Sequence, residues 1–240
     1  MTDAIVIIPT YNEIENIEAI VKAVFSQDTS FHILVVDDNS PDGTAQKVIA
    51  MQNEYPEQLF LLQRAEKNGL GTAYIEGFKW CLERTYAYIF EMDADFSHNP
   101  NDLVKLLNAC KDGDADVAIG SRYVKGVNVV NWPMARVLLS YMASKYVRFI
   151  TRMKIHDTTA GFVCYKRKVL ETINLDAIKF IGYAFQIEMK FKAHLKKFKI
   201  VEVPVIFTDR TLGKSKMSGS IISEAIFGVI SLKLKSLFSK

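Results

Sequence analysis

The sequence has 240 residues, 49% of them hydrophobic, which is enough apolar material for one large domain. Its three cysteines, Cys81, Cys110 and Cys164, lie far apart, so the spacing excludes a disulfide framework and a zinc site with close ligand pairs, and we expect reduced thiols. The net charge of +3 is unevenly distributed: residues 190–240 carry eleven Lys or Arg against three Asp or Glu, a balance of +8, which leaves −5 for residues 1–189.

Short apolar runs rich in β-forming residues alternate with longer segments of helical period in the first half of the chain. Strands are expected at residues 4–8, 32–37, 59–63, 86–92 and 116–119, and helices at residues 13–26, 43–54, 70–84 and 101–111. This alternation is typical of parallel strands joined by helical crossovers, and it predicts an α/β fold with a mostly parallel central sheet flanked by helices.

The pattern changes after Gly120, where a loop rich in Gly and Asn leads to a long helical segment. Helices are expected at residues 133–154, 185–197 and 218–238, and strands at residues 162–166 and 200–203. Because no repeat or flexible linker interrupts the chain, we expect one domain over residues 1–216 with two functional halves, 1–120 and 121–216. An amphipathic helix in residues 217–240 follows it.

Polar residues stand directly after four of the expected strands. They occupy residues 9–13, 37–43, 93–95 and 120–123. Ligands of an open parallel sheet bind beyond the carboxyl ends of its strands, so these segments predict a site at one edge. Asn12, Ser40 and Asp42 have an equally good explanation as helix caps or turn residues.

Asp93 and Asp95 form the most informative pair. Carboxylates at positions i and i+2 of an extended segment project to the same side, and they repel each other unless a cation lies beside them. Two acids without a His or Cys partner favour Mg²⁺ or Mn²⁺, which take further ligands from water and substrate phosphates. The four histidines show no metal-ligand spacing and are expected to be structural.

The glycines at positions 69 and 71 do not form a dinucleotide fingerprint, because Tyr74 stands where a third glycine is needed. We expect them to make a close turn into the following helix.

From Arg122 to Ile155 there are seven basic residues and no acidic one. They are Arg122, Lys125, Arg136, Lys145, Arg148, Arg152 and Lys154. Nucleic acid, anionic lipid head groups and phosphorylated substrates would all suit this run. A nucleic-acid-binding module would use this run, and a nucleotidyltransferase would use the acidic pair on an α/β sheet, so both stand as hypotheses.

A set of motifs then resembles one known family. The motifs are IIPTYNE from residue 7, VVDDNSPDGT from 35, NGLGTA from 68, MDADFSHNP from 92, GSRYVKG from 120, NWP from 131, TAGF from 159, and Arg210, Gly213, Ser215 and Lys216. In this order they look like the dolichol-phosphate mannose synthases of glycosyltransferase family two, which have the GT-A fold, a nucleotide-sugar-binding sandwich. The resemblance covers residues 5 to about 216.

The resemblance implies roles for individual residues. Nucleotide binding is implied for Pro9, Tyr11, Glu13, Val36, Asp38, Asp93 and Ala94. Asp95 would be the direct metal ligand, with Asp93 on the ribose and metal side and Ser97 in the metal set, where the family often has Gln or Ser. Phosphate binding and catalysis are implied for Arg122, Arg136, Arg210 and Lys216.

The implied reaction transfers mannose from GDP-mannose to a polyprenyl (dolichyl) phosphate, with inversion at the anomeric carbon, and uses Mg²⁺ or Mn²⁺. A phosphate monoester is ionised near neutral pH, because its second pKa is about 6, so no general base is needed. The QxxRW signature of processive synthases is absent, which implies a single transfer. A glucosyltransferase that uses a UDP-sugar and the same acceptor is the alternative.

The longest uncharged stretches of the apolar helical regions, residues 137–144 and 225–232, are far shorter than the roughly 20 residues that span a bilayer. We therefore expect helices 133–154 and 218–238 to lie on a membrane surface. Because the N-terminus lacks a signal-peptide pattern, we expect a cytoplasmic protein, peripheral on the cytoplasmic face of the membrane. Nucleic acid is not an expected partner, whereas a separate membrane anchor protein stays open.

Overall fold

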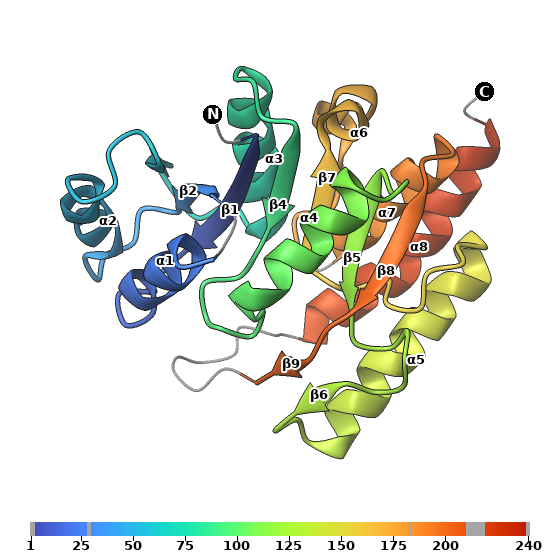
Figure 1. The fold of residues 1–240 in the computed structure, drawn as a ribbon. Coiled ribbons are helices and arrows are strands. Elements are labelled where there is room, and N and C mark those ends of the chain that lie inside the picture. The colour runs from blue at the N-terminus through green and yellow to red at the C-terminus, as the bar shows by residue number, and fades with distance from the viewer. Residues whose placement is uncertain (1–2, 28–29, 183, 210–218, 239–240) are drawn as a thin grey trace.

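The computed structural model describes residues 3–27, 30–182, 184–209 and 219–238 (Figure 1). The strands are β1 (Ala4–Thr10), β2 (His32–Asp37), β3 (Leu59–Gln63), β4 (Tyr88–Glu91), β5 (Val117–Ser121), β6 (Val129–Val130), β7 (Val163–Lys166), β8 (Ile200–Pro204) and β9 (Phe207–Thr208). The α-helices are α1 (Ile17–Phe25), α2 (Thr44–Gln52), α3 (Leu70–Leu82), α4 (Leu103–Lys111), α5 (Met134–Thr151), α6 (Arg167–Thr172), α7 (Ala184–Leu195) and α8 (Gly219–Phe238). Two short 3-10 helices, η1 (Pro100–Asp102) and η2 (Leu175–Ala177), complete the elements.

Seven strands form the central sheet in the order β3-β2-β1-β4-β7-β5-β8. All neighbours pair in parallel except β7, which lies antiparallel between β4 and β5. Because β7 runs against its neighbours, the segment that precedes it lies at the edge where β1, β2, β4 and β5 end. The mostly parallel sheet predicted from the sequence is confirmed, and the antiparallel insertion brings one further loop to the functional edge.

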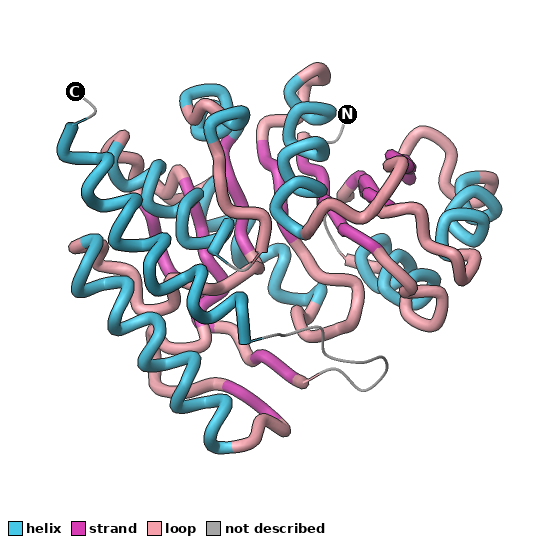
Figure 2. The backbone as a smooth tube through the Cα atoms, turned by 180° about the vertical axis from the view of Figure 1, so that it is seen from behind, coloured by secondary structure: helices cyan, strands magenta, loops and turns pink. Residues whose placement is uncertain are grey.

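Helices cover both faces of the sheet, and alternating strand side chains build two apolar cores. On β1, Ile5 and Ile7 pack in the core under α3, α5, α6, α7 and α8, whereas Val6 and Ile8 pack in the core under α1, α2 and α4. Strands buried on both faces read as continuous apolar runs, which is why the sequence reveals them clearly. Figure 2, which views the first of these layers, shows α5 and α8 side by side.

The observed elements differ from the expected ones mainly at their ends. Helix α1 begins four residues later than predicted, because Asn12 adopts a left-handed conformation (φ 58°) and a turn follows it. Helix α5 ends at a left-handed Arg152. The short elements α6, β6 and β9 were not predicted, and β6 pairs with β9 in a separate two-stranded sheet.

The glycine turn predicted before α3 is confirmed. Gly69 has φ 99°, and a Cβ at Gly71 would lie 2.8 Å from the carbonyl oxygen of Phe180. The three cysteines are free and buried, as expected. Among the described residues, no helix combines the length and the apolar character needed to cross a bilayer.

Candidate active site

A cavity of about 470 Å³ lies at the carboxyl edge of the sheet, between the strand ends and α5. Its polar side chains are Asp93, Ser97, His98, Arg122, Arg136, Ser140, Thr159 and Gln186. The rest of the wall is mostly apolar and includes Leu70, Trp132, Leu139, Met142, Tyr146, Val147, Ile187, Val205 and Phe207. The cavity therefore suits a ligand that combines a charged group with an apolar part.

The segment after β4 carries the predicted acidic pair. The Asp95 carboxylate is buried and accepts a hydrogen bond from the backbone N–H of Ser97 at 3.1 Å, while the Asp93 side chain is 37% exposed and lines the cavity. The backbone N–H of Asp93 donates to Nδ1 of His98 at 3.1 Å. His98 thus ties both ends of the segment together.

His98 was expected to be structural, and the structure also places it in the cavity wall, stacked on Phe162. Burial lowers the pKa of His98 to about 4, so the ring is neutral at physiological pH. An Nδ1 that accepts a hydrogen bond puts the proton of the neutral ring on Nε2. No spacing signal in the sequence indicates this arrangement.

Asp93, Asp95 and Ser97 offer oxygen ligands in one short segment. The hydroxyl oxygen of Ser97 is buried and makes no hydrogen bond within the described part of the chain. Across residues 3–27, 30–182, 184–209 and 219–238, no group of three or more His, Cys, Asp or Glu side chains could hold a metal ion by itself. The donor set fits a hard divalent cation that completes its coordination with substrate oxygens and water.

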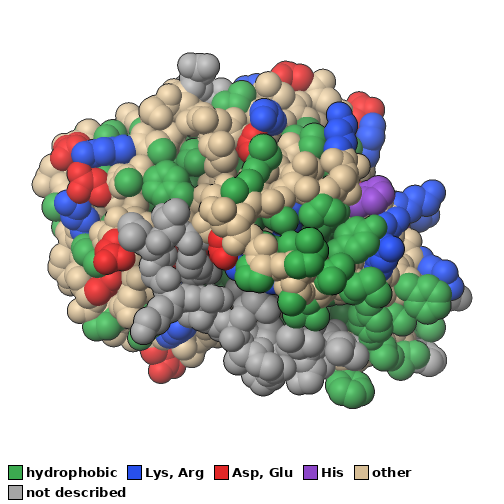
Figure 3. All heavy atoms as spheres, turned by 90° about the horizontal axis from the view of Figure 1, so that it is seen from below, with side chains coloured by type: hydrophobic (Ala, Val, Ile, Leu, Met, Phe, Trp, Pro, Cys, Tyr) green, Lys and Arg blue, Asp and Glu red, His purple; other side chains and the backbone are tan. Residues whose placement is uncertain are grey.

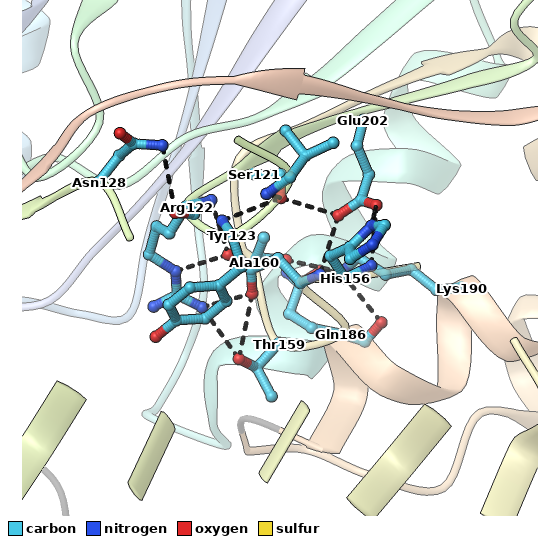
Figure 4. Close-up of polar contacts among 12 residues, drawn as sticks. Ser121, Arg122, Tyr123, Asn128, His156, Thr159, Ala160, Gln186, Lys190 and Glu202 are labelled. Atoms are coloured by element: carbon cyan, nitrogen blue, oxygen red, sulfur yellow. Dashed lines mark hydrogen bonds and ion pairs between the residues drawn. The ribbon is translucent and has the colours of Figure 1, made fainter. Parts of the chain in front are cut away.

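Arg122, directly after β5, is held at the cavity by a buried carboxylate that the sequence analysis did not single out. Asp157 accepts hydrogen bonds from Nε and Nη2 of Arg122, both at 2.6 Å, and Thr159 accepts from the same Nη2 at 2.9 Å (Figure 4). Burial opposes ionisation of Asp157, but the charge and hydrogen bonds of Arg122 prevail and lower its pKa. The acid-free basic run is thus compensated by an acid just beyond its end.

Arg136 lies on α5 and reaches the same cavity. Its Nη1 donates to Asp209 at 2.8 Å, and its guanidinium lies 4.1 Å from the centre of the Trp132 ring. The two other predicted phosphate-binding residues, Arg210 and Lys216, lie outside the described residues.

Of the predicted nucleotide-binding residues, Pro9, Tyr11, Glu13, Val36 and Asp38 lie at the ends of β1 and β2, while Asp93 and Ala94 follow β4. Asp93 alone of this set lines the cavity. Asp38 is buried and accepts from Nη1 of Arg64 at 2.6 Å, while Lys67 lies 4.1 Å above the Tyr11 ring. Val36 is fully buried on the α3 side of the sheet, so its side chain offers no surface to a ligand. The ends of β1 and β2 thus lie apart from the cavity, with the segment after β4 between them.

Pro9, Glu13 and Ala94 complete the set that was predicted to bind the nucleotide. Pro9 is a residue of β1, and the backbone N–H of Glu13 donates to Oγ1 of Thr44 at 3.0 Å. Ala94, between the two aspartates, is buried with 4% exposure.

A buried chain of polar groups under the cavity was also missed. The ammonium group of Lys190 donates to the carbonyl oxygen of Ala160 at 2.6 Å and to Oε1 of Gln186 at 3.1 Å, and Nε2 of Gln186 donates to Glu91 at 2.7 Å. All three charged or amide side chains are at most 2% exposed. They connect α7 with the strand that leads to Asp93 and with the segment before β7.

Comparison with known proteins defines the class. The fold resembles a solved mannosyltransferase from Pyrobaculum calidifontis in complex with GDP-Man and Mn²⁺, with a TM-score of 0.61, 16% identity, and coverage of 99% of this chain and 74% of that one. This likeness shows a fold of the GT-A type.

The sequence comparisons name the family. Residues 5–173 match the model of glycosyl transferase family 2, and the chain belongs to that family. It is 51% identical to a polyprenol monophosphomannose synthase from Mycolicibacterium smegmatis, over 94% of this chain and 84% of that protein. It is 45% identical to an undecaprenyl-phosphate mannosyltransferase from Micrococcus luteus, over 93% of this chain and 90% of that protein. The family resemblance inferred from the motifs is confirmed.

Proposed function

We propose that the protein transfers mannose from GDP-mannose to a polyprenyl phosphate, with inversion at the anomeric carbon. The observation that carries this proposal is the cavity, which places Asp93, Arg122 and Arg136 against a wall of apolar side chains from α5. A lipid phosphate has both of these characters. The names of the two relatives support the same donor sugar and the same class of acceptor.

On the donor side, Pro9, Tyr11, Glu13, Val36 and Asp38 are proposed to hold the nucleotide. A divalent ion, Mg²⁺ or Mn²⁺, would be held by Asp93, Asp95 and Ser97. It would supply charge stabilisation to the leaving diphosphate.

On the acceptor side, Arg122 and Arg136 are proposed to hold the phosphate, since guanidinium groups bind phosphate oxygens at two points. Arg210 and Lys216 are proposed to act on the same phosphates. Because the acceptor phosphate is ionised near neutral pH, it attacks without a general base. The neutral His98 packs against Phe162 and keeps the segment after β4 in place.

The acceptor would reach the cavity from a membrane surface. Helices α5 and α8 carry exposed apolar side chains, of which Leu139 and Met142 also line the cavity: Met134, Leu138, Leu139, Met142, Phe149, Phe227, Leu234 and Leu237. Figure 3 shows hydrophobic side chains gathered on one part of this face, with Lys and Arg at its margin. Apolar side chains bordered by basic ones suit an anionic lipid interface, so we propose peripheral membrane binding from the cytoplasmic side.

The test is a donor panel with radiolabelled GDP-mannose, UDP-glucose and GDP-glucose, a polyprenyl phosphate in detergent, and Mg²⁺ or Mn²⁺. We expect a base-stable, acid-labile mannolipid from GDP-mannose alone. Transfer from UDP-glucose instead would replace this proposal with the glucosyltransferase alternative. Pyrophosphate release without lipid product would indicate a nucleotidyltransferase.

A further inference from the structure

The segment that connects α5 to β7 forms part of the cavity wall without being a helix or strand. Residues 156–161 supply Thr159, Ala160 and Gly161 to the lining, while Asp157 and Thr158 are fully buried behind it. Asp157 is not among the lining residues. It is therefore buried out of reach of a ligand in the cavity, although its partner Arg122 is not.

The carboxylate of Asp157 accepts hydrogen bonds from both the backbone and the side chain of Arg122. Oδ2 accepts the backbone N–H of Arg122 at 3.0 Å and its Nε at 2.6 Å, and Oδ1 accepts Nη2 at 2.6 Å. Two parallel hydrogen bonds along one edge fix the plane of the guanidinium, which a single contact would leave free to rotate. Backbone and side chain of Arg122 are thus held by one group.

A second carboxylate holds the backbone around Asp157. Oε1 of Glu202, on β8, accepts the backbone N–H of Asp157 at 2.8 Å and the hydroxyl of Ser121 at 2.7 Å. Its Oε2 accepts the backbone N–H of His156 at 2.8 Å. In the same segment, the ammonium group of Lys190 donates to the Ala160 carbonyl (Figure 4). Asp157 is therefore itself fixed in position by β8 and α7.

The negative charge of Asp157 lies next to the arginine that is proposed to bind the acceptor phosphate. An anion beside a phosphate-binding arginine weakens phosphate binding by charge alone, so its benefit must lie elsewhere. Fixing the plane of a long, flexible side chain before the substrate arrives lowers the entropy that is lost when the reacting groups are aligned. Orientation is the gain that offsets the weaker attraction.

We propose that Asp157 is a positioning residue for the acceptor phosphate: it acts through Arg122 and does not touch the substrate. Glu202 supports it by holding the backbone of residues 156 and 157. This inference rests on the proposed function, because it takes Arg122 to bind the acceptor.

The test measures steady-state kinetics for Asp157→Asn, Arg122→Ala and the double variant. Asp157→Asn keeps the shape of the side chain and removes its charge. We expect kcat/KM for the polyprenyl phosphate to fall about 10- to 100-fold, while KM for GDP-mannose stays within about twofold. In the Arg122→Ala background, Asp157→Asn should cause no further loss, because residues that act through one another are not additive.

Glu188→Gln is the matched control. Glu188 is also buried, and it accepts the backbone N–H groups of Lys179 and Phe180 at 2.9 and 3.1 Å, away from Arg122. If Asp157→Asn does not fold, Thr159→Val removes the Arg122–Thr159 bond and the 3.4 Å hydrogen bond from the Thr159 hydroxyl to Asp157, with the Arg122–Asp157 ion pair intact. Thr159→Val should then also lower kcat/KM for the polyprenyl phosphate selectively, by a smaller factor than Asp157→Asn.

Two results would overturn the inference. One is an equal loss from Asp157→Asn in the wild-type and Arg122→Ala backgrounds. The other is a loss of kcat/KM in Asp157→Asn or Thr159→Val that is equal for donor and acceptor. In that case the loss of activity would parallel the fall in melting temperature, as expected for the control Glu188→Gln. A wild-type enzyme that ignores polyprenyl phosphate would instead refute the proposed function, so the two failures are distinguishable.

Discussion

Replacement of the buried Lys190 by Met offers a quantitative test of the polar chain under the cavity. The Lys190 ammonium group is 0% exposed and donates to three oxygens, the Ala160 carbonyl, the Gln186 carbonyl and the Gln186 side chain. Burial lowers the pKa of Lys190, and the opposite charge of the equally buried Glu91 counteracts that effect. Methionine fills a similar volume but removes the charge and all three donors.

The expected cost follows from what stays behind. Burial raises the pKa of Glu91 to about 8 although the charge of Lys190 counteracts this rise, so the loss is expected mainly at the three buried oxygens that lose their donor. At about 1–2 kcal/mol for each unsatisfied acceptor, the free energy of unfolding should fall by about 3–5 kcal/mol. For a domain of this size that corresponds to a fall in Tm of roughly 6–20 °C. Urea unfolding followed by circular dichroism measures the free energy, with an unchanged m-value as the sign of an intact fold.

Lys196→Met is the control, because Lys196 is exposed just after α7 and its loss should change the free energy of unfolding by no more than about 0.5 kcal/mol. If Lys190→Met costs as little as Lys196→Met, the reasoning about a buried charge network is wrong.

Other predictions concern the metal site, the membrane, the thiols and acid stability. Asp95→Asn should lower mannosyl transfer by orders of magnitude at unchanged Tm, since an amide does not replace an anionic ligand; near wild-type activity after metal removal and restoration would contradict the site. Phe149→Ser should reduce flotation with anionic liposomes relative to Ile49→Ser, an exposed position on α2; equal flotation would place the membrane face elsewhere. Burial raises the pKa of Cys81 to about 12, so thiol reagents should label it only on unfolding. The lowered pKa of Asp157 stabilises the fold above its unfolded pKa of about 3.9, and this contribution is lost as pH falls through the folded value; Asp157→Asn should therefore flatten the decline of stability in acid.

Local patterns in the sequence determined the fold class, most of the elements and the acidic pair. Asp93 and Asp95 are recognisable because they follow a buried apolar strand, and the turn at Gly69 because glycine tolerates a positive φ. Such signals depend on residues that are neighbours in the chain, so they survive without a structure. The family motifs extend them, because their order is a property of the sequence itself.

Only the tertiary structure decided which groups hold the site together. Asp157 is hydrogen-bonded to Arg122, 35 residues away in the sequence, and Glu202 is hydrogen-bonded to Asp157, 45 residues away. The antiparallel insertion of β7 brings these residues to the edge where the parallel strands end. Burial and hydrogen-bond partners arise when distant elements pack, and they set the charge state of His98 and Asp157. A basic run without acids therefore looks unpaired in the sequence, although the fold supplies its carboxylate.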